Sequence, residues 1–172
     1  MSRFAGRGLE QFWFAFCIPI TLLLDLQSIY PKSWLASTPL PAFFRYSIDL
    51  ARDPILGGAL SGSKEFAWLR LFFFLEGAFQ LPCFILGAIG LWRNDKRVYP
   101  LLLAYGASTA TTLVPCLGAL FTAMPNPPFT TVEMATLLSE YIPFLLIPLG
   151  MAVDMGAKLV NIVNQAQERK AI

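Results

Sequence analysis

Apolar residues gather in four long runs along this chain, and polar, charged or proline-rich segments separate the runs. The runs cover residues 11–31, 71–92, 100–121 and 136–163. At a rise of about 1.5 Å per residue, a run such as 71–92 forms a helix about 33 Å long, enough to cross a hydrocarbon core about 30 Å thick. The pattern therefore predicts an all-α membrane protein that folds as a four-transmembrane-helix bundle.

Each of the four runs also contains proline. Proline inside a membrane helix bends the helix and frees a carbonyl group, which must find another partner within the protein. We therefore expect proline-kinked helices that can enclose a cavity. The prolines are Pro19, Pro82, Pro115, Pro143 and Pro148.

The longest connection between runs, residues 31–65, is rich in proline, serine, glycine and charged residues. Within it, residues 41–54 read as a short amphipathic helix that ends at Asp53-Pro54, because proline disfavours helical geometry at the residue before it. The apolar side chains of this loop can lie on the bilayer surface or fold back over the bundle as a lid, and both alternatives stay open. These side chains are Phe43, Phe44, Ile48 and Leu56.

Basic residues orient the expected bundle. The turn 93–97, RNDKR, carries three basic residues, whereas the proline-rich turn 124–131 carries none. Cytosolic loops of membrane proteins carry an excess of Lys and Arg, so we expect the turn 93–97 and both termini in the cytosol. Residues 31–65 then lie on the luminal side, although they also contain basic residues, because the rule weakens for long loops.

Composition agrees with a membrane location and argues against several classes of function. Of the 172 residues, 56% are hydrophobic and 14% are charged, against about 25% charged in soluble domains. The net charge of +2 is small and the basic residues are dispersed, so no nucleic-acid partner is expected. Histidine is absent and the three cysteines lie in apolar runs, where we read them as packing residues. The sequence therefore predicts no metal site, no cofactor and no histidine-dependent triad.

Two acids lie inside the first two runs, Asp25 and Glu76. An acid near the middle of a membrane helix costs about 2.5 to 3.5 kcal/mol on insertion scales and normally has a partner in the bundle interior. Helical rise places both acids in the luminal half, and two carboxyls close together in low dielectric share one proton. We therefore expect Asp25 and Glu76 to face each other in a luminal-side cavity. The alternative is that the pair only holds two helices together.

The anion of such a pair would attract a cationic amine inside an apolar cavity. The apolar body of that ligand is expected to lie against Phe72, Leu75 and the third and fourth helices. The polar residues at a similar depth are Gln80, Thr112 and Tyr141.

Five segments stand in an order and spacing that point to a known family. They are IPITLLLDLQSIYP (18–31), ARDP (51–54), FLEGAFQLP (74–82), TTLVP (111–115) and YIPFLLIP (141–148). Together they resemble the sigma-2 receptor branch of the EXPERA-domain family, which also includes the emopamil-binding-protein sterol isomerases. The resemblance implies an EXPERA-type four-helix membrane domain over residues 10–158 and a cytosolic tail, 159–172. The end of that tail, RKAI, is similar to a dilysine retrieval signal.

The resemblance also implies a function and a site. It implies a homodimeric endoplasmic-reticulum membrane protein that binds sterols, other hydrophobic molecules and cationic amines, contacts membrane lipid, and serves cholesterol homeostasis with a sterol-transport membrane protein. In this site Asp25 would pair with the ligand amine, protonated Glu76 would bond to Asp25, and Asp53 would support the site. The residues that would line it are Gln80, Thr112 and Tyr141. The chain departs from the family pattern at Ser47 and Phe144, which replace tyrosines, and at Ser108, which replaces a histidine.

Two classes of function remain open. The first is a non-enzymatic protein that binds sterols and cationic amphiphilic ligands. The second is a sterol isomerase that uses Asp25 and Glu76 as acid and base, since two carboxyls of separated pKa can move a double bond. The isomerases of the family use a histidine, and this chain has none, so the sequence favours binding without catalysis. A purely structural partner of another membrane protein would leave both buried acids unexplained.

Overall fold

The structure, a computed structural model, describes residues 5–23, 25–28, 30–61, 64–122, 125 and 127–170. The regular elements of these residues are all helical, which confirms the all-α prediction. The elements are α1 (Ala5–Leu23), η1 (Asp25–Ser28), α2 (Lys32–Leu35), α3 (Leu40–Ala51), α4 (Pro54–Ser61), α5 (Ala67–Leu75), η2 (Glu76–Gln80), α6 (Leu81–Trp92), η3 (Lys96–Val98), α7 (Tyr99–Thr122) and α8 (Thr131–Glu168).

Three helices within the described residues are long and apolar enough to cross a membrane. They are Ala67–Trp92, which joins α5, η2 and α6; Lys96–Thr122, which joins η3 and α7; and Thr131–Glu168, which is α8. These helices match the second, third and fourth predicted spans. The first predicted span contains only a shorter apolar helix, Phe12–Leu23, so the count of four spans stays a prediction.

The first apolar run, residues 11–31, does not form one continuous helix, because α1 ends at Leu23. Side chains of the next turn bond to its last carbonyl groups. The Gln27 amide donates to the carbonyl of Leu23, and the Tyr30 hydroxyl donates to that of Leu22 at 2.9 Å. The last carbonyls of a helix have no partner within the helix, so these bonds stabilise the break.

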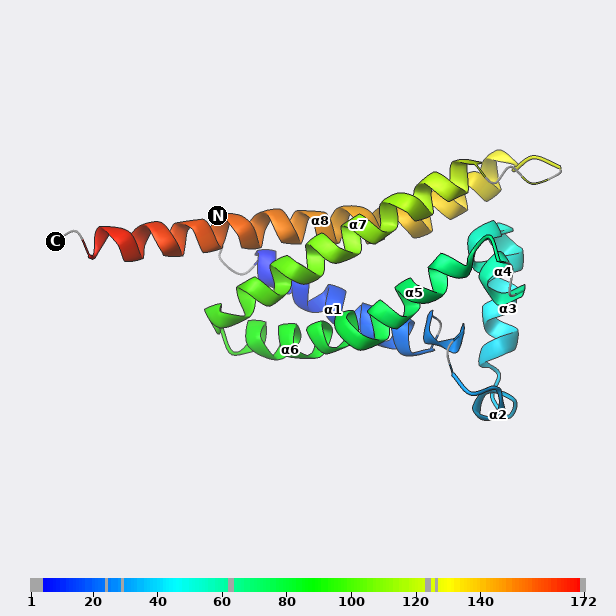
Figure 1. Ribbon diagram of the computed structural model, residues 1–172, viewed down its shortest axis with the longest axis horizontal. Coiled ribbons are helices and arrows are strands. Elements are labelled where there is room, and N and C mark those ends of the chain that lie inside the picture. The colour runs from blue at the N-terminus through cyan, green and yellow to red at the C-terminus, as the bar shows by residue number, and fades with distance from the viewer. Residues whose placement is uncertain are drawn as a thin grey trace.

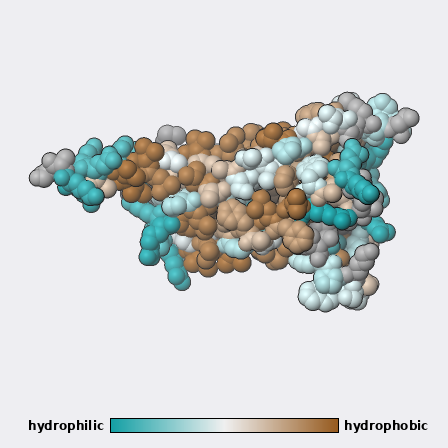
Figure 2. Space-filling view, viewed as in Figure 1, coloured by the Kyte–Doolittle hydropathy of each residue, from teal (hydrophilic) through white to brown (hydrophobic). Residues whose placement is uncertain are grey.

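The long helices form one bundle. Figure 1 shows α1, α5–α6, α7 and α8 running along the long axis, with α7 packed on α8 and α1 packed on α6. The short helices α2 to α4 gather at one end, and both chain termini and the turn with η3 lie toward the other. Figure 2 shows an apolar surface along the middle of the molecule and hydrophilic residues at both ends. This distribution is the one expected of a bundle embedded in a membrane.

Buried apolar side chains form two clusters. We call the first the terminal core, because it lies on the side of the chain termini; its buried members are Trp13, Phe14, Cys17, Cys83, Phe84, Leu91, Val98, Tyr99, Leu102, Tyr105, Met151 and Met155. We call the second the loop core; its buried members are Ala51, Ile55, Ala59, Phe66, Leu69, Phe73, Cys116, Leu120 and Leu137. All three cysteines belong to one core or the other, as the packing interpretation requires.

The first loop covers one end of the bundle with part of its surface. Ile55 is fully buried and Ile48 is 8% exposed, while α3 contacts α8 and α4 contacts α7. Phe43, in contrast, is 57% exposed. The buried side of the loop therefore covers the end of the bundle as a lid. Phe43 is on the exposed side and can lie on a bilayer surface.

A close approach between α7 and α8 fixes the middle of the bundle. A Cβ atom added to Gly106 would lie 2.4 Å from the backbone oxygen of Pro148 and 3.0 Å from the nitrogen of Ala152. Small residues let helix backbones approach each other in membranes. Gly106 therefore sets how deeply the next turn of α7, which carries Thr109, lies in the bundle.

Candidate intramembrane binding site

Glu76 lies near the middle of the helix Ala67–Trp92, where the backbone changes from α to π geometry. The N–H of Leu81 bonds to the carbonyl of Glu76, five residues earlier. Pro82 follows directly; proline has no N–H, and its ring collides with the carbonyl four residues before it. The wider turn relieves that collision, and π-turns inside α-helices often occur at functional sites.

The Glu76 side chain has a partner that the sequence did not reveal. The Thr21 hydroxyl donates a hydrogen bond of 2.7 Å to Oε1 of Glu76, and Thr21 is 2% exposed. Thr21 lies one helical turn before Asp25 in sequence. A signal for it existed, because Thr21 is the one polar residue in the sequence between Gln11 and Asp25.

The predicted pairing of Asp25 with Glu76 lies outside what the structure describes, because the Asp25 side chain is not among the described parts. Its backbone begins η1, which contacts α5, the helix that leads into Glu76. The pairing therefore stays a prediction.

Two further polar side chains are buried in the same part of the bundle. Gln80 is 7% exposed and Thr109 is 5% exposed. The Thr109 hydroxyl lies near the hydroxyl of Tyr105, which accepts from the indole N–H of Trp13 at 3.0 Å, but among the described residues it makes no hydrogen bond of ordinary geometry. A buried polar group without a partner is unfavourable, so this position favours a ligand or water that supplies one. Thr112, which was expected to line the site, donates its hydroxyl to the backbone carbonyl of Thr109 at 3.0 Å.

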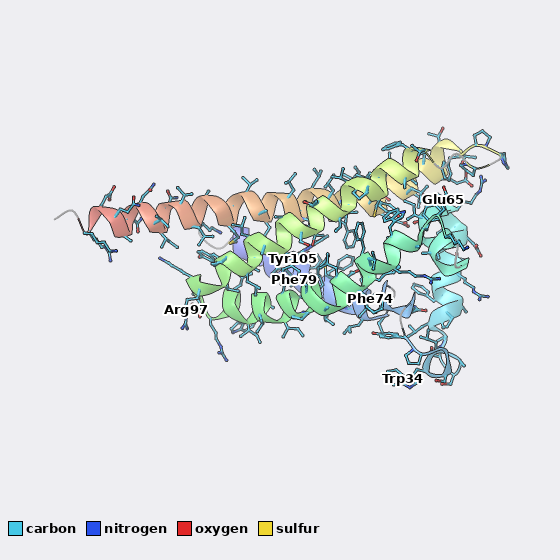
Figure 3. All side chains as sticks on the ribbon, in the orientation of Figure 1. Trp34, Glu65, Phe74, Phe79, Arg97 and Tyr105 are labelled. Carbon is cyan, nitrogen blue, oxygen red and sulfur yellow. The ribbon has the colours of Figure 1, made fainter. Side chains whose placement is uncertain are left out.

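These polar residues separate the two cores. Along Ala67–Trp92, Glu76 and Gln80 follow residues of the loop core and precede residues of the terminal core. Thr109 on α7 stands between the two cores in the same way. We call Thr21, Glu76, Gln80 and Thr109 the polar layer. Figure 3 labels Phe79 and Tyr105 in this middle part, with Arg97 at one end of the bundle and Glu65 and Trp34 at the other.

Asp53 and Tyr141, which were expected to belong to one site, are in direct contact. Tyr141 donates its hydroxyl to Oδ2 of Asp53 at 2.8 Å, and the N–H groups of Ile55 and Leu56 donate to Oδ1 at 2.8 and 3.0 Å. Asp53 thereby caps α4 and ties the lid to α8. Burial raises the pKa of Asp53 above its ordinary value, although the three hydrogen bonds act in the opposite direction.

One residue of the expected apolar wall, Phe72, packs against the loop core. Phe72 is half-buried and meets Trp68 edge to face, with ring centroids 5.3 Å apart. Leu75, also half-buried, comes directly before Glu76. Both side chains therefore lie on the lid side of the polar layer in sequence.

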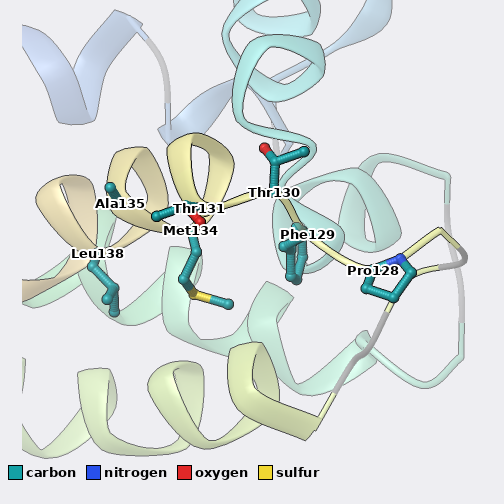
Figure 4. A pocket seen from close by; sticks show the side chains of 7 residues that line it. All are labelled: Pro128, Phe129, Thr130, Thr131, Met134, Ala135 and Leu138. Atoms are coloured by element: carbon teal, nitrogen blue, oxygen red, sulfur yellow. The ribbon is translucent and has the colours of Figure 1, made fainter.

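Two grooves lie elsewhere on the molecule. The larger, about 530 Å³, follows the proline-rich turn and the start of α8 (Figure 4) and is lined by Pro128, Phe129, Thr130, Thr131, Met134, Ala135 and Leu138. The smaller, about 330 Å³, is lined by Ala88, Ile89, Trp92 and Arg93. The predicted luminal-side cavity is neither of these grooves and stays a prediction.

The fold and the polar layer define a helical membrane protein with buried polar groups in its middle. Residues 30–155 match the family EXPERA (EXPanded EBP superfamily), and the chain belongs to this family. It is 30% identical over 150 residues to Sigma intracellular receptor 2 of Xenopus tropicalis, with 84% of each chain covered. It is 31% identical over 147 residues to Sigma intracellular receptor 2 of Homo sapiens, with 80% of each chain covered. It is 28% identical over 163 residues to Efficient mitochondria targeting-associated protein 19 of Schizosaccharomyces pombe, with 92% of this chain and 79% of that protein covered.

Proposed function

We propose that this chain is a non-enzymatic membrane protein that binds sterols and cationic amphiphilic molecules at the polar layer. The observation that carries the proposal is the hydrogen bond between Thr21 and Glu76, in the middle of a bundle whose cores lie to either side. Membership of the EXPERA family supports a sterol-related role.

The chemistry of the layer fits an amphiphile. A carboxylate in low dielectric attracts a cationic amine strongly, and the buried hydroxyl of Thr109 can bond to a ligand hydroxyl. The apolar residues on both sides of the layer can contact a rigid apolar body. In this proposal Asp25 supplies the countercharge, and Glu76 holds the shared proton.

The test uses the purified full chain with a radiolabelled cationic amphiphile. Asp25→Asn should abolish amine binding, and Glu76→Gln should weaken it less than Glu76→Ala because glutamine keeps a hydrogen-bond donor. Asp49→Asn, an exposed acid of α3, is the control and should leave binding unchanged. Unchanged affinity in a folded Asp25→Asn protein would refute the assignment.

The proposal includes an endoplasmic-reticulum location, four spans with both termini cytosolic, a homodimer and a link to sterol trafficking. The arrangement of both chain ends and η3 toward one end of the bundle supports this topology (Figure 1). A glycosylation acceptor engineered near Asn126 should be modified, and one in the turn 93–97 should not. The reverse pattern would mean that the orientation is wrong.

The alternative function is a sterol isomerase of the emopamil-binding-protein type. The description of the matching family, EXPanded EBP superfamily, supports this alternative. Acid–base catalysis requires a group within hydrogen-bond reach of the proton that it transfers. Glu76 already bonds to Thr21, and no histidine is present. Expression in cells that lack their sterol isomerase should therefore not restore the shifted-double-bond sterol; product that appears, and is lost in Glu76→Gln, would establish the enzyme instead.

A further inference from the structure

A groove at the end of α6 differs in chemistry from the polar layer. It has a volume of about 330 Å³ and combines three mostly apolar residues, Ala88, Ile89 and Trp92, with one cation, Arg93. Trp92 is 80% exposed and Ile89 is 44% exposed. The groove lies where the apolar span Ala67–Trp92 ends, so it faces lipid on one side and water on the other.

The turn after the groove carries an excess of positive charge. It contains Arg93, Lys96 and Arg97 but only one acid, Asp95. Asp95 pairs with Arg97 at 2.9 Å and also accepts that residue's backbone N–H. Among the described residues, Arg93 and Lys96 form no ion pair, and both are exposed. Arg93, which lines the groove, and Lys96, three residues further along the turn, therefore keep their charge available.

We propose that this surface, the α6-end groove with Arg93 and Lys96, binds an anionic phospholipid of the adjacent leaflet. The phosphate contacts the two cations, and an acyl chain lies along Ile89 and Trp92. Three features specify this occupant: the apolar part of the groove is continuous with the membrane-facing surface, its polar end is cationic, and Trp92 has the amphipathic ring typical of the headgroup level. A zwitterionic lipid would gain little from the two cations.

The test measures lipid retention by native mass spectrometry on the purified full chain. The probes are dioctanoyl phosphatidylserine and dioctanoyl phosphatidylcholine at equal concentration. Each basic residue near a lipid surface is worth about fivefold in affinity, so the double variant Arg93→Gln/Lys96→Gln should lose about 30-fold in phosphatidylserine binding and little in phosphatidylcholine binding.

The matched control is Arg45→Gln/Lys64→Gln, which removes the same net charge from two exposed residues near the lid. This control should keep the phosphatidylserine preference. An equal loss in both double variants would assign the preference to net charge and overturn the proposal, and so would an unchanged preference in Arg93→Gln/Lys96→Gln. Competition by soluble glycerophosphoserine as strong as that by the lipid would assign the site to free phosphate and overturn the lipid assignment.

Discussion

The hydrogen bond between Thr21 and Glu76 is the contact of the polar layer that can be tested most directly. Its length of 2.7 Å is ideal for an O–H···O bond, and Thr21 is 2% exposed. Because the proposal gives the shared proton to Glu76, the bond joins two neutral groups; such a bond contributes about 0.5 to 1.5 kcal/mol in water-soluble proteins, and side-chain bonds in membrane proteins average about 0.6 and reach about 1.7 kcal/mol. We therefore expect a coupling energy of about 0.5 to 1.5 kcal/mol.

The measurement is a double-mutant cycle of Thr21→Val and Glu76→Ala, with unfolding of the purified protein followed in detergent. Valine keeps the shape of threonine and removes the donor, so the cycle isolates the bond from the packing changes. Thr111→Val is the control: its exposed hydroxyl bonds to the carbonyl of Ala107 in its own helix, and its effect should stay within about 0.5 kcal/mol. A coupling energy below about 0.3 kcal/mol would show that the polar layer is not held by this bond.

Two further predictions concern the packing of the bundle and the lid. Gly106→Ala should destabilise the protein by about 1 to 3 kcal/mol, because its Cβ would collide with Pro148, whereas Gly118→Ala, which meets no atom within 4 Å, should be neutral or slightly stabilising in thermal unfolding. Tyr141→Phe should cost about 1 to 2 kcal/mol by removing the donor to Asp53. Burial raises the pKa of the Asp53 carboxyl in the folded protein above its value in the unfolded chain, about 3.9. The free energy of unfolding should therefore be highest below pH about 3.9 and decrease as the pH rises through the folded-state pKa, and Asp53→Asn should remove this dependence.

The apolar pattern predicted the long helices well where a turn separates two runs. The third run, 100–121, agrees with α7, Tyr99–Thr122, because charged residues end the preceding run sharply. The fourth helix is longer than its apolar run 136–163, because Thr130 and Glu133 form a capping box that starts α8 earlier. A capping box is a local polar motif and adds nothing to a hydropathy count.

The site was less accessible to sequence reasoning. Asp53 and Tyr141 are 88 residues apart, and only the resemblance to a family joined them. The Thr21 hydroxyl was missed because one threonine in an apolar helix has no periodic signal, and its contact depends on how α1 packs on its neighbours. The π-turn at Glu76 was also missed, although the proline six residues later, Pro82, is the physical reason for it.

The polar layer also explains why the bundle has two cores instead of one. Each core has its own aromatic and aliphatic members, and none of the four layer residues belongs to either core. Leucine at the four layer positions would avoid the insertion cost of an acid, about 2.5 to 3.5 kcal/mol, and the cost of burying the Thr109 hydroxyl, which makes no hydrogen bond of ordinary geometry among the described residues. The layer therefore lowers the stability of the unliganded bundle at three helices and leaves both cores intact. This pattern fits the proposed function, because a ligand that bonds to the polar groups recovers the lost free energy on binding.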